Sequence, residues 1–175
     1  MTERRTAKVY IDGANVFYAQ KKLAWSLDWK KVVNELKRQW NVIEFRYYTG
    51  VKVGDEKMAS FLRALDHIGF TVITKHLKVI KIDQAHPLHR EHQYTEIYKS
   101  NFDVEVTADM LLERGNIDDI ILFSGDSDFA YVVKKLKDVG KRVIVFSSRK
   151  TLSWELKLMA STYYFLENYQ KEWQK

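Results

Sequence analysis

Short apolar runs alternate with amphipathic segments along the chain, and this alternation narrows its possible folds more than any other feature. Runs of strand length occur at residues 8–12, 44–51, 70–82, 117–124, 142–146 and 163–166. Apolar residues recur with a helical period at residues 28–40, 56–67, 129–139 and 151–160. Strands that alternate with helices at this spacing predict an α/β fold, with a mainly parallel central sheet covered by helices on both faces.

Local signals predict where these helices begin and end. Ser26 or Asp28 can cap the first helix, and Thr151 can cap the last. Gly69 and Gly140 follow the second and third helices as stop signals. Open parallel sheets bind ligands beyond the carboxyl ends of their strands, so the residues that close each strand are where function is expected.

The length and composition predict one domain. The chain has 175 residues, of which 46% are hydrophobic and 14% aromatic, and this suffices for a substantial core. We expect residues 1–167 to form a single domain and residues 168–175 to form a polar C-terminal tail. The segment from residue 167 onward could instead form a helix for self-association, so a homodimer is an open alternative.

Cysteine and long apolar runs are both absent from the sequence. The lack of Cys excludes a disulfide scaffold, a thiolate metal site and a cysteine nucleophile, and it is compatible with a reducing compartment. No apolar run approaches the roughly 20 residues that span a membrane, and the N-terminus has no signal-peptide pattern. We therefore expect a cytoplasmic protein with no membrane partner.

Positive charge is in excess. The chain has 29 Lys and Arg residues against 23 Asp and Glu, a net charge of +6. A basic domain favours polyanionic partners such as nucleic acid. A solvated, lysine-rich surface is the alternative explanation.

Short acidic side chains follow two of the predicted strands. Asp12 ends the first strand, and Asp126 and Asp128 follow the fourth; a third acidic stretch with Asp103 and Asp109 begins a predicted helix. If the first and fourth strands are neighbours, their ends lie about 5 Å apart and the acids converge. Because carboxylates repel one another unless a cation joins them, this pattern predicts a site for a hard divalent ion such as Mg²⁺.

Helix capping is the alternative explanation for each acid taken alone. Asp126 precedes a predicted helix, and Asp103 could cap its own helix. Capping explains Asp12 poorly, and it does not explain three acidic clusters at one edge of a sheet.

Four ordered segments resemble the motifs of a known family. They are residues 10–15 (YIDGAN), 99–104 (KSNFDV), 108–111 (ADML) and 122–129 (LFSGDSDF). Together they resemble the NYN domain family, most closely its LabA-like branch within the PIN-like nuclease superfamily, over about residues 8–166. The motif that is usually Lys-Gly-Val-Asp differs here, since one extra residue separates Lys99 from Asp103 and the Gly is missing.

The resemblance implies a Rossmann-like three-layer α/β/α sandwich, a PIN-like fold. It also implies a ribonuclease that hydrolyses RNA phosphodiester bonds with Mg²⁺ or Mn²⁺. The acids that would bind the metal and carry catalysis are Asp12, Asp103, Asp126 and Asp128.

Three further residues are implied in supporting roles. Asn15 and Ser124 would orient side chains or substrate, and Asp109 matches an acid that recurs in the family. Asp103 and Asp109 are six residues apart, about 600° of helical rotation, so they do not share a helix face. We therefore expect Asp103 to be the direct ligand and Asp109 to support it.

Substrate contacts are predicted from basic residues. Arg149 and Lys150 follow the fifth predicted strand at the presumed active edge, and with Lys99 we expect them to bind substrate phosphates. Phe17 and Tyr18 lie just past Asn15 and could stack on a base, but packing into the core is the simpler expectation.

Three histidines recur at intervals of three residues. His86, His89 and His92 could share a helical face, and such spacing suggests zinc. Pro87 disfavours a helical His86, so we expect an exposed loop or hairpin that could touch substrate rather than a zinc site.

The sequence leaves some other functional classes open and disfavours others. A nuclease-like fold that binds RNA without cleaving it, and a regulatory or scaffold protein, stay open as alternatives. A phosphatase with a nucleophilic Asp12 would need a second acid two residues later, where the chain has Ala14. No P-loop motif occurs.

Overall fold

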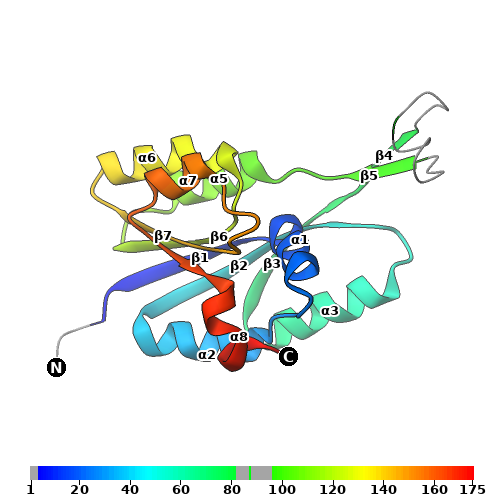
Figure 1. The fold of residues 1–175 in the computed structure, drawn as a ribbon, viewed down its shortest axis with the longest axis horizontal. Helices are drawn as coiled ribbons and strands as arrows, with labels where there is room; N and C mark the ends of the chain where they lie inside the picture. Colours follow the sequence, from blue (N-terminus) through cyan, green and yellow to red (C-terminus); the bar gives the residue numbers. More distant parts are fainter. Residues whose placement is uncertain (1–3, 82–86, 88–95) are drawn as a thin grey trace.

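A computed structural model describes residues 4–81, 87 and 96–175. The predicted histidine loop with His86, His89 and His92 lies outside the described residues. Figure 1 shows a twisted central sheet with helices on both faces, which confirms the expected three-layer α/β/α arrangement. Among the described residues, no helix is both long and apolar enough to cross a membrane.

The main sheet is six-stranded and entirely parallel. Its strands are β1 (Thr6–Asp12), β2 (Asn41–Val51), β3 (Phe70–His76), β6 (Asp119–Phe123), β7 (Arg142–Ser147) and β8 (Thr162–Phe165). Their order in space is β3-β2-β1-β6-β7-β8. The chain builds the sheet outward from β1 to one side and then returns to build the other side from β6. The change of direction falls between β1 and β6, the position where such sheets bind ligands.

The helices form two layers. Helices α1 (Gly13–Leu23), α2 (Trp29–Gln39), α3 (Glu56–His67) and α8 (Gln170–Trp173) pack on one face of the sheet. The other face carries α5 (Asp103–Leu112), α6 (Ala130–Asp138) and α7 (Trp154–Met159). Short 3₁₀ turns η1 (Ser127–Phe129) and η2 (Leu166–Tyr169) precede α6 and α8. Outside these layers, β4 (Lys78–Lys81) and β5 (Glu96–Lys99) pair antiparallel and extend away from the body (Figure 1).

Alternating side chains of the central strands fill both cores. On β6, Ile121 and Phe123 join the core beneath α1 and α2, whereas Ile120 and Leu122 join the core beneath α5 and α6. Every residue of β6 is buried, so the strand is one continuous apolar run after its first residue.

A buried carboxylate fixes the amino-terminal ends of the central strands. Asp119, the first residue of β6, is fully buried. It accepts hydrogen bonds from Arg5 Nε at 2.8 Å, from Arg142 Nε at 3.0 Å and Nη2 at 2.8 Å, and from Trp40 Nε1 at 2.8 Å. Because two guanidinium groups and an indole surround it, the buried charge is fully compensated.

Most of the predicted elements are confirmed. Helix α3 has the predicted bounds, and α2 begins after Asp28, whose side chain accepts from the N–H groups of Lys30 and Lys31. The first and fourth predicted strands, now β1 and β6, are neighbours.

Three predictions of local structure were incomplete or wrong. The run at 70–82 divides at Leu77, whose N–H donates to Val51, so β3 and β4 belong to different sheets. Helix α7 is capped by Ser153 rather than by Thr151, because Thr151 Oγ1 hydrogen-bonds to Ser147 and Ser148. Helix α1, directly after Asp12, was not predicted.

The C-terminal segment is not a free tail. Trp173 on α8 is 1% exposed and stacks on Tyr169 with ring centroids 4.2 Å apart. Its ring also lies 5.5 Å from that of Phe146. The backbone N–H of Asp28 donates to Trp173 O at 2.7 Å, so the segment joins the core and the start of α2. The apolar stack, rather than the polar residues around it, decides the position of this segment.

This packing predicts a large cost for truncating Trp173. Trp173→Ala should lower the free energy of unfolding by about 3–5 kcal/mol, the usual cost of removing a buried Trp side chain. Trp173→Phe should cost much less, because it keeps an aromatic ring and removes a buried indole N–H that has no partner in the described part of the chain. Urea unfolding followed by circular dichroism measures both. Unchanged stability after deletion of residues 168–175 would contradict this packing.

Candidate metal centre

Asp12 stands where β1 passes into α1, and it serves both elements. Its Oδ1 accepts from Asn15 N at 3.1 Å and so caps α1, while its Oδ2 accepts from Ser124 Oγ at 3.0 Å. The expectation that capping explains Asp12 poorly was therefore wrong, and the unrecognised helix α1 is the reason. One carboxylate thus links the end of β1 to the end of β6.

Asn15 and Ser124 complete this link between the two strands. Asn15 Oδ1 accepts from Gly125 N at 2.9 Å, and Ser124 Oγ accepts from Asp126 N at 3.2 Å. Ser124 thus contacts two of the acids through one hydroxyl group. Both residues position the backbone that carries Asp12 and Asp126.

Close backbone approach explains the two glycines of these motifs. A Cβ atom at Gly13 would lie 2.6 Å from Tyr48 O, and one at Gly125 would lie 2.2 Å from Thr151 O. Neither position leaves room for a side chain. The glycines therefore allow the strand ends to pack tightly around the acids.

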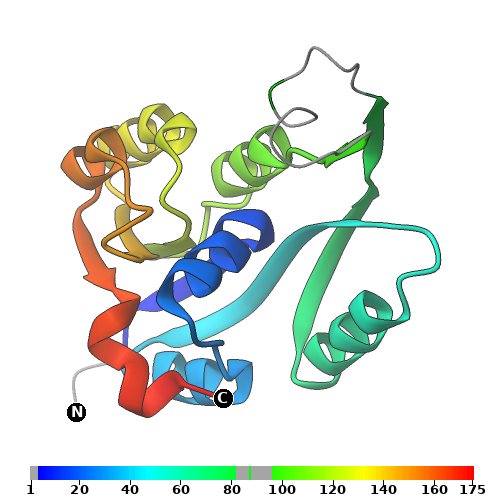
Figure 2. The same cartoon turned by 45° about the vertical axis from the view of Figure 1, so that its right-hand side comes forward.

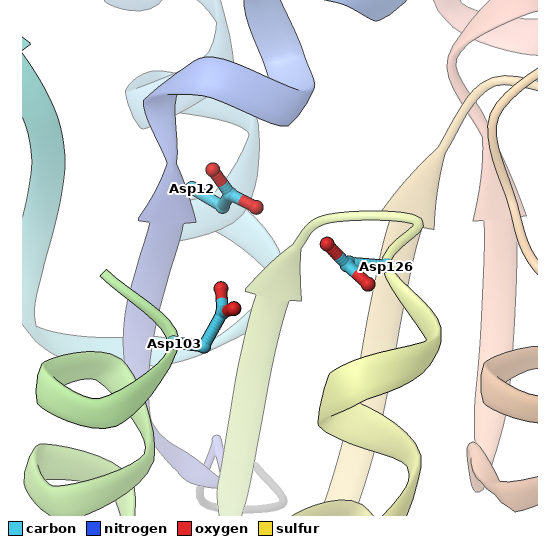
Figure 3. A group of neighbouring side chains, drawn as sticks. All are labelled: Asp12, Asp103 and Asp126. Atoms are coloured by element: carbon cyan, nitrogen blue, oxygen red, sulfur yellow. The ribbon is translucent and has the colours of Figure 1, made fainter. Parts of the chain in front are cut away.

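Three carboxylates converge at this point of the sheet. Asp12, Asp103 and Asp126 each place one oxygen so that the three oxygens lie within 4.8 Å of one another (Figure 3). They come from the end of β1, the first residue of α5 and the loop after β6. All three are partly buried.

The Asp103 carboxylate has no capping role. Helix α5 begins at Asp103, its N-cap residue is Phe102, and no side chain caps it. The N–H of Asp103 donates to Asn101 Oδ1 at 2.8 Å, which fixes the start of the helix. Capping therefore accounts for Asp12 and Asp126, but not for Asp103.

The convergence has an electrostatic cost. Burial raises the pKa of Asp12, and the charges of Asp103 and Asp126 raise it further, against the hydrogen bonds from Asn15 and Ser124 that lower it. Burial also raises the pKa of Asp103, and the charges of Asp126, Asp128 and Glu105 act in the same direction. A divalent cation at this point would replace the repulsion with attraction.

Asp128 and Asp109 lie outside the convergent group. Asp128 is exposed on η1, and its N–H donates to Asp126 Oδ1 at 3.0 Å. Asp109 accepts from Arg46 Nη1 at 2.8 Å and from Tyr48 Oη at 2.7 Å. Asp109 thus joins α5 to β2, as part of an ion-pair group that also contains Glu113.

The predicted phosphate contacts are dispersed. The backbone N–H of Arg149 donates to Glu167, and its guanidinium lies 4.3 Å from the centroid of the Phe165 ring. Lys150 Nζ donates to Lys22 O at 3.1 Å, which joins this loop to the end of α1. Lys99 is exposed at the end of β5.

Sequence reasoning missed two aspects of the surroundings. Phe17 and Tyr18 do not pack into the core, since they are 53% and 60% exposed. Tyr47 lies buried on β2, where burial and the charge of Asp12 raise the pKa of its phenol. The one signal that could have located Tyr47 is the parallel pairing of β1 with β2, which places Tyr47 opposite Ile11, one residue before Asp12.

Comparison with known proteins identifies the family. The model of the NYN domain matches residues 6–167. The chain belongs to the NYN domain family. NYN domains are PIN-like nuclease domains, and this membership suggests a hydrolase.

One relative agrees with this family membership, and one solved structure shares the fold. The chain is 31% identical over 157 residues to the low amplitude and bright protein LabA of Synechococcus elongatus. The aligned region covers 89% of this chain and 80% of that protein. A crystal structure of a protein of unknown function from Vibrio parahaemolyticus matches with a TM-score of 0.78. That match covers 100% of this chain and 99% of the other at 20% identity, and it shows the fold alone.

The repulsion among the acids predicts how Asp126→Asn changes stability. In EDTA at neutral pH the variant should melt at a higher temperature than the wild type, since it removes one charge and Asn caps a helix as well as Asp does. The pKa values of Asp12 and Asp103 are raised in the folded state, so the penalty exists only where these groups are ionised. It should therefore vanish as the pH falls toward about 4, the unfolded value for Asp. Thermal melts from neutral to acid pH measure the difference.

Added Mn²⁺ or Mg²⁺ should reverse this order. A cation that binds only the folded protein raises the melting temperature of the wild type. The melting temperature of Asp126→Asn should respond little, because one ligand has lost its charge. If neither ion at millimolar concentration changes the melting temperature of the wild type, this result would contradict a metal centre.

Proposed function

We propose that this NYN domain is a divalent-metal-dependent ribonuclease. The observation that supports this most strongly is the convergence of Asp12, Asp103 and Asp126 from three separate elements, at the point where the sheet changes direction. Their mutual repulsion is a cost that the fold alone does not require. Membership of the NYN family supports RNA as the substrate class.

The donor set suits a hard divalent ion. Among the residues that the structure describes, the group has three carboxylates and no softer ligand, which favours Mg²⁺ or Mn²⁺ over zinc or copper. Asp12, Asp103 and Asp126 would hold the ion, and Asp128 would act from the rim of the site. When bound, the ion would lower the pKa of a water molecule and stabilise negative charge on the scissile phosphate.

The remaining groups of the site act by position. Asn15 and Ser124 hold the ends of β1 and β6 together, so the carboxylates stay at a fixed separation. The excess of positive charge attracts a polyanionic substrate to a site that is itself acidic. The acids need the ion before a phosphodiester can approach, because the bare cluster repels phosphate.

A cleavage assay tests this proposal. The purified protein is incubated with single-stranded RNA, structured RNA or single-stranded DNA, in Mg²⁺, Mn²⁺ or EDTA. Metal-dependent cleavage of RNA is the expected result. Salt-sensitive RNA binding without cleavage in any metal would instead favour a non-cleaving RNA-binding protein.

The site geometry predicts unequal effects of the acids. Asp12→Asn and Asp126→Asn should each lower the cleavage rate by at least about 100-fold, because each removes a charge from the convergent group. Asp128→Asn should lower the cleavage rate less, since the Asp128 side chain lies outside that group. Asp138→Asn, an exposed acid at the end of α6, is the matched control and should cleave like the wild type. Wild-type cleavage by Asp126→Asn would refute the assignment.

A further inference from the structure

A groove of about 840 Å³ lies beside the acids, on the face of the sheet that carries α1. Its walls come from α1, the end of β2, the start of α3 and the base of the β4–β5 pair. Figure 2 views the molecule toward the region between α1 and α3. We call this groove the α1–β5 groove. Its volume lies within the range of about 300–1,000 Å³ that is usual for ligand sites.

The groove approaches the candidate metal centre through residues that neighbour the acids in the sequence. Gly13 and Ala14, the two residues after Asp12, line one end of it. The ring of Tyr47 lines the same end and packs against Gly13 so closely that a Cβ there would lie 2.7 Å from Tyr47 Cε1. Ser100, three residues before Asp103, also lines the groove, so residues next to two of the acids take part in its walls.

Exposed aromatic rings stand on both sides of the groove. Phe17 and Tyr18 project from α1, and Tyr98 projects from β5. Tyr98 is 40% exposed, and the two rings on α1 are more than half exposed. Large rings that are exposed on two different elements contribute little to the core, and such rings suit stacking on planar ligands.

The charge of the groove suits a polyanion. Lys57 and Lys99 are among its lining residues, and Lys52 Nζ lies 4.3 Å from the centroid of the Tyr98 ring. Among the lining residues that the structure describes, Asp55 is the one acid, and its side chain caps α3 by accepting from Met58 N at 2.9 Å. Lysines beside aromatic rings match alternating phosphates and bases.

We propose that the α1–β5 groove binds unpaired nucleotides of an RNA strand, with bases against Tyr18 and Tyr98 and phosphates against Lys99. The faces of paired bases are covered by their neighbours in a duplex, so this mode of binding requires a single strand. The strand leads from the groove to the three acids, which makes single-stranded RNA the substrate. The statement about cleavage rests on the proposed ribonuclease function, whereas the statement about binding does not.

Equilibrium binding in EDTA tests the groove without any cleavage. The probe is a fluorescently labelled single-stranded RNA, compared with the same strand in a perfect duplex. The single strand should bind more tightly than the duplex. Tyr18→Ala and Tyr98→Ala should each weaken its binding by about tenfold, a typical effect of losing one stacked base.

Tyr163→Ala is the matched control. Tyr163 is 36% exposed, close to the value for Tyr98, but it lies on β8 at the other side of the sheet from β2 and β3. It should bind RNA like the wild type. A strand that carries 2-aminopurine adds a direct signal, since stacking should quench its fluorescence on the wild type and less on Tyr18→Ala or Tyr98→Ala.

The outcomes separate the two proposals. Loss of single-strand binding in the groove variants, with no cleavage in any metal, would support the groove and refute the nuclease. Metal-dependent cleavage of single strand and duplex at equal rates, or wild-type binding by Tyr18→Ala and Tyr98→Ala, would overturn the groove and leave the nuclease standing. An equal loss of binding in Tyr163→Ala would also overturn it.

Discussion

The hydrogen bonds that join the ends of β1 and β6 are the interaction on which the rest of the site depends. Asp12 accepts from Ser124, and Asn15 accepts from the backbone of Gly125, so each strand end holds the other. Parallel pairing alone would leave these ends free to separate. With them fixed, the loop after β6 directs Asp126 toward Asp12, and α5 adds Asp103 from the opposite helical layer.

The carboxylates at the two ends of β6 have opposite electrostatic surroundings. At its start, Asp119 is fully buried and surrounded by donors from Arg5, Arg142 and Trp40. Beyond its end, Asp126 faces other carboxylates. The compensated charge anchors the sheet, and the uncompensated charges are those that the proposed ion would neutralise. The stabilising carboxylate thus lies at the amino-terminal edge of the sheet, and the candidate site lies at the carboxyl-terminal edge.

Much of this arrangement could be predicted from the sequence, because it follows from local patterns. The alternation of strands and helices predicted the fold class, and the acids at strand ends predicted the edge where three carboxylates converge. The sequence did not predict that β1 pairs with β6; convergence of the acids was expected only if these two strands were neighbours. It depends on which strands become neighbours, a matter of tertiary packing.

The rest could not be predicted, for particular physical reasons. Helix α1 is amphipathic only in part, since Phe17 and Tyr18 are large apolar residues that lie exposed, outside the face that Gly13, Val16 and Ala19 bury. The groove is assembled from several separate helices, strands and loops, and its lining has no common sequence signal. Trp173 sits among polar residues that suggest a tail, and only its contact with Phe146 and Tyr169 reveals its place in the core.

The capping geometry of Asp12 and Asp126 has a consequence for how such a protein can change over time. At Asp126, where one oxygen caps η1, Asn fulfils the same role and removes a charge that the metal-free fold disfavours. At Asp12 both oxygens accept hydrogen bonds, so Asn would lose one acceptor there. A single substitution at Asp126 would therefore remove one carboxylate of the proposed metal centre and keep a folded domain with its groove intact. The fold alone therefore favours keeping Asp12 but not Asp126, whose carboxylate would be preserved by selection for the proposed ion.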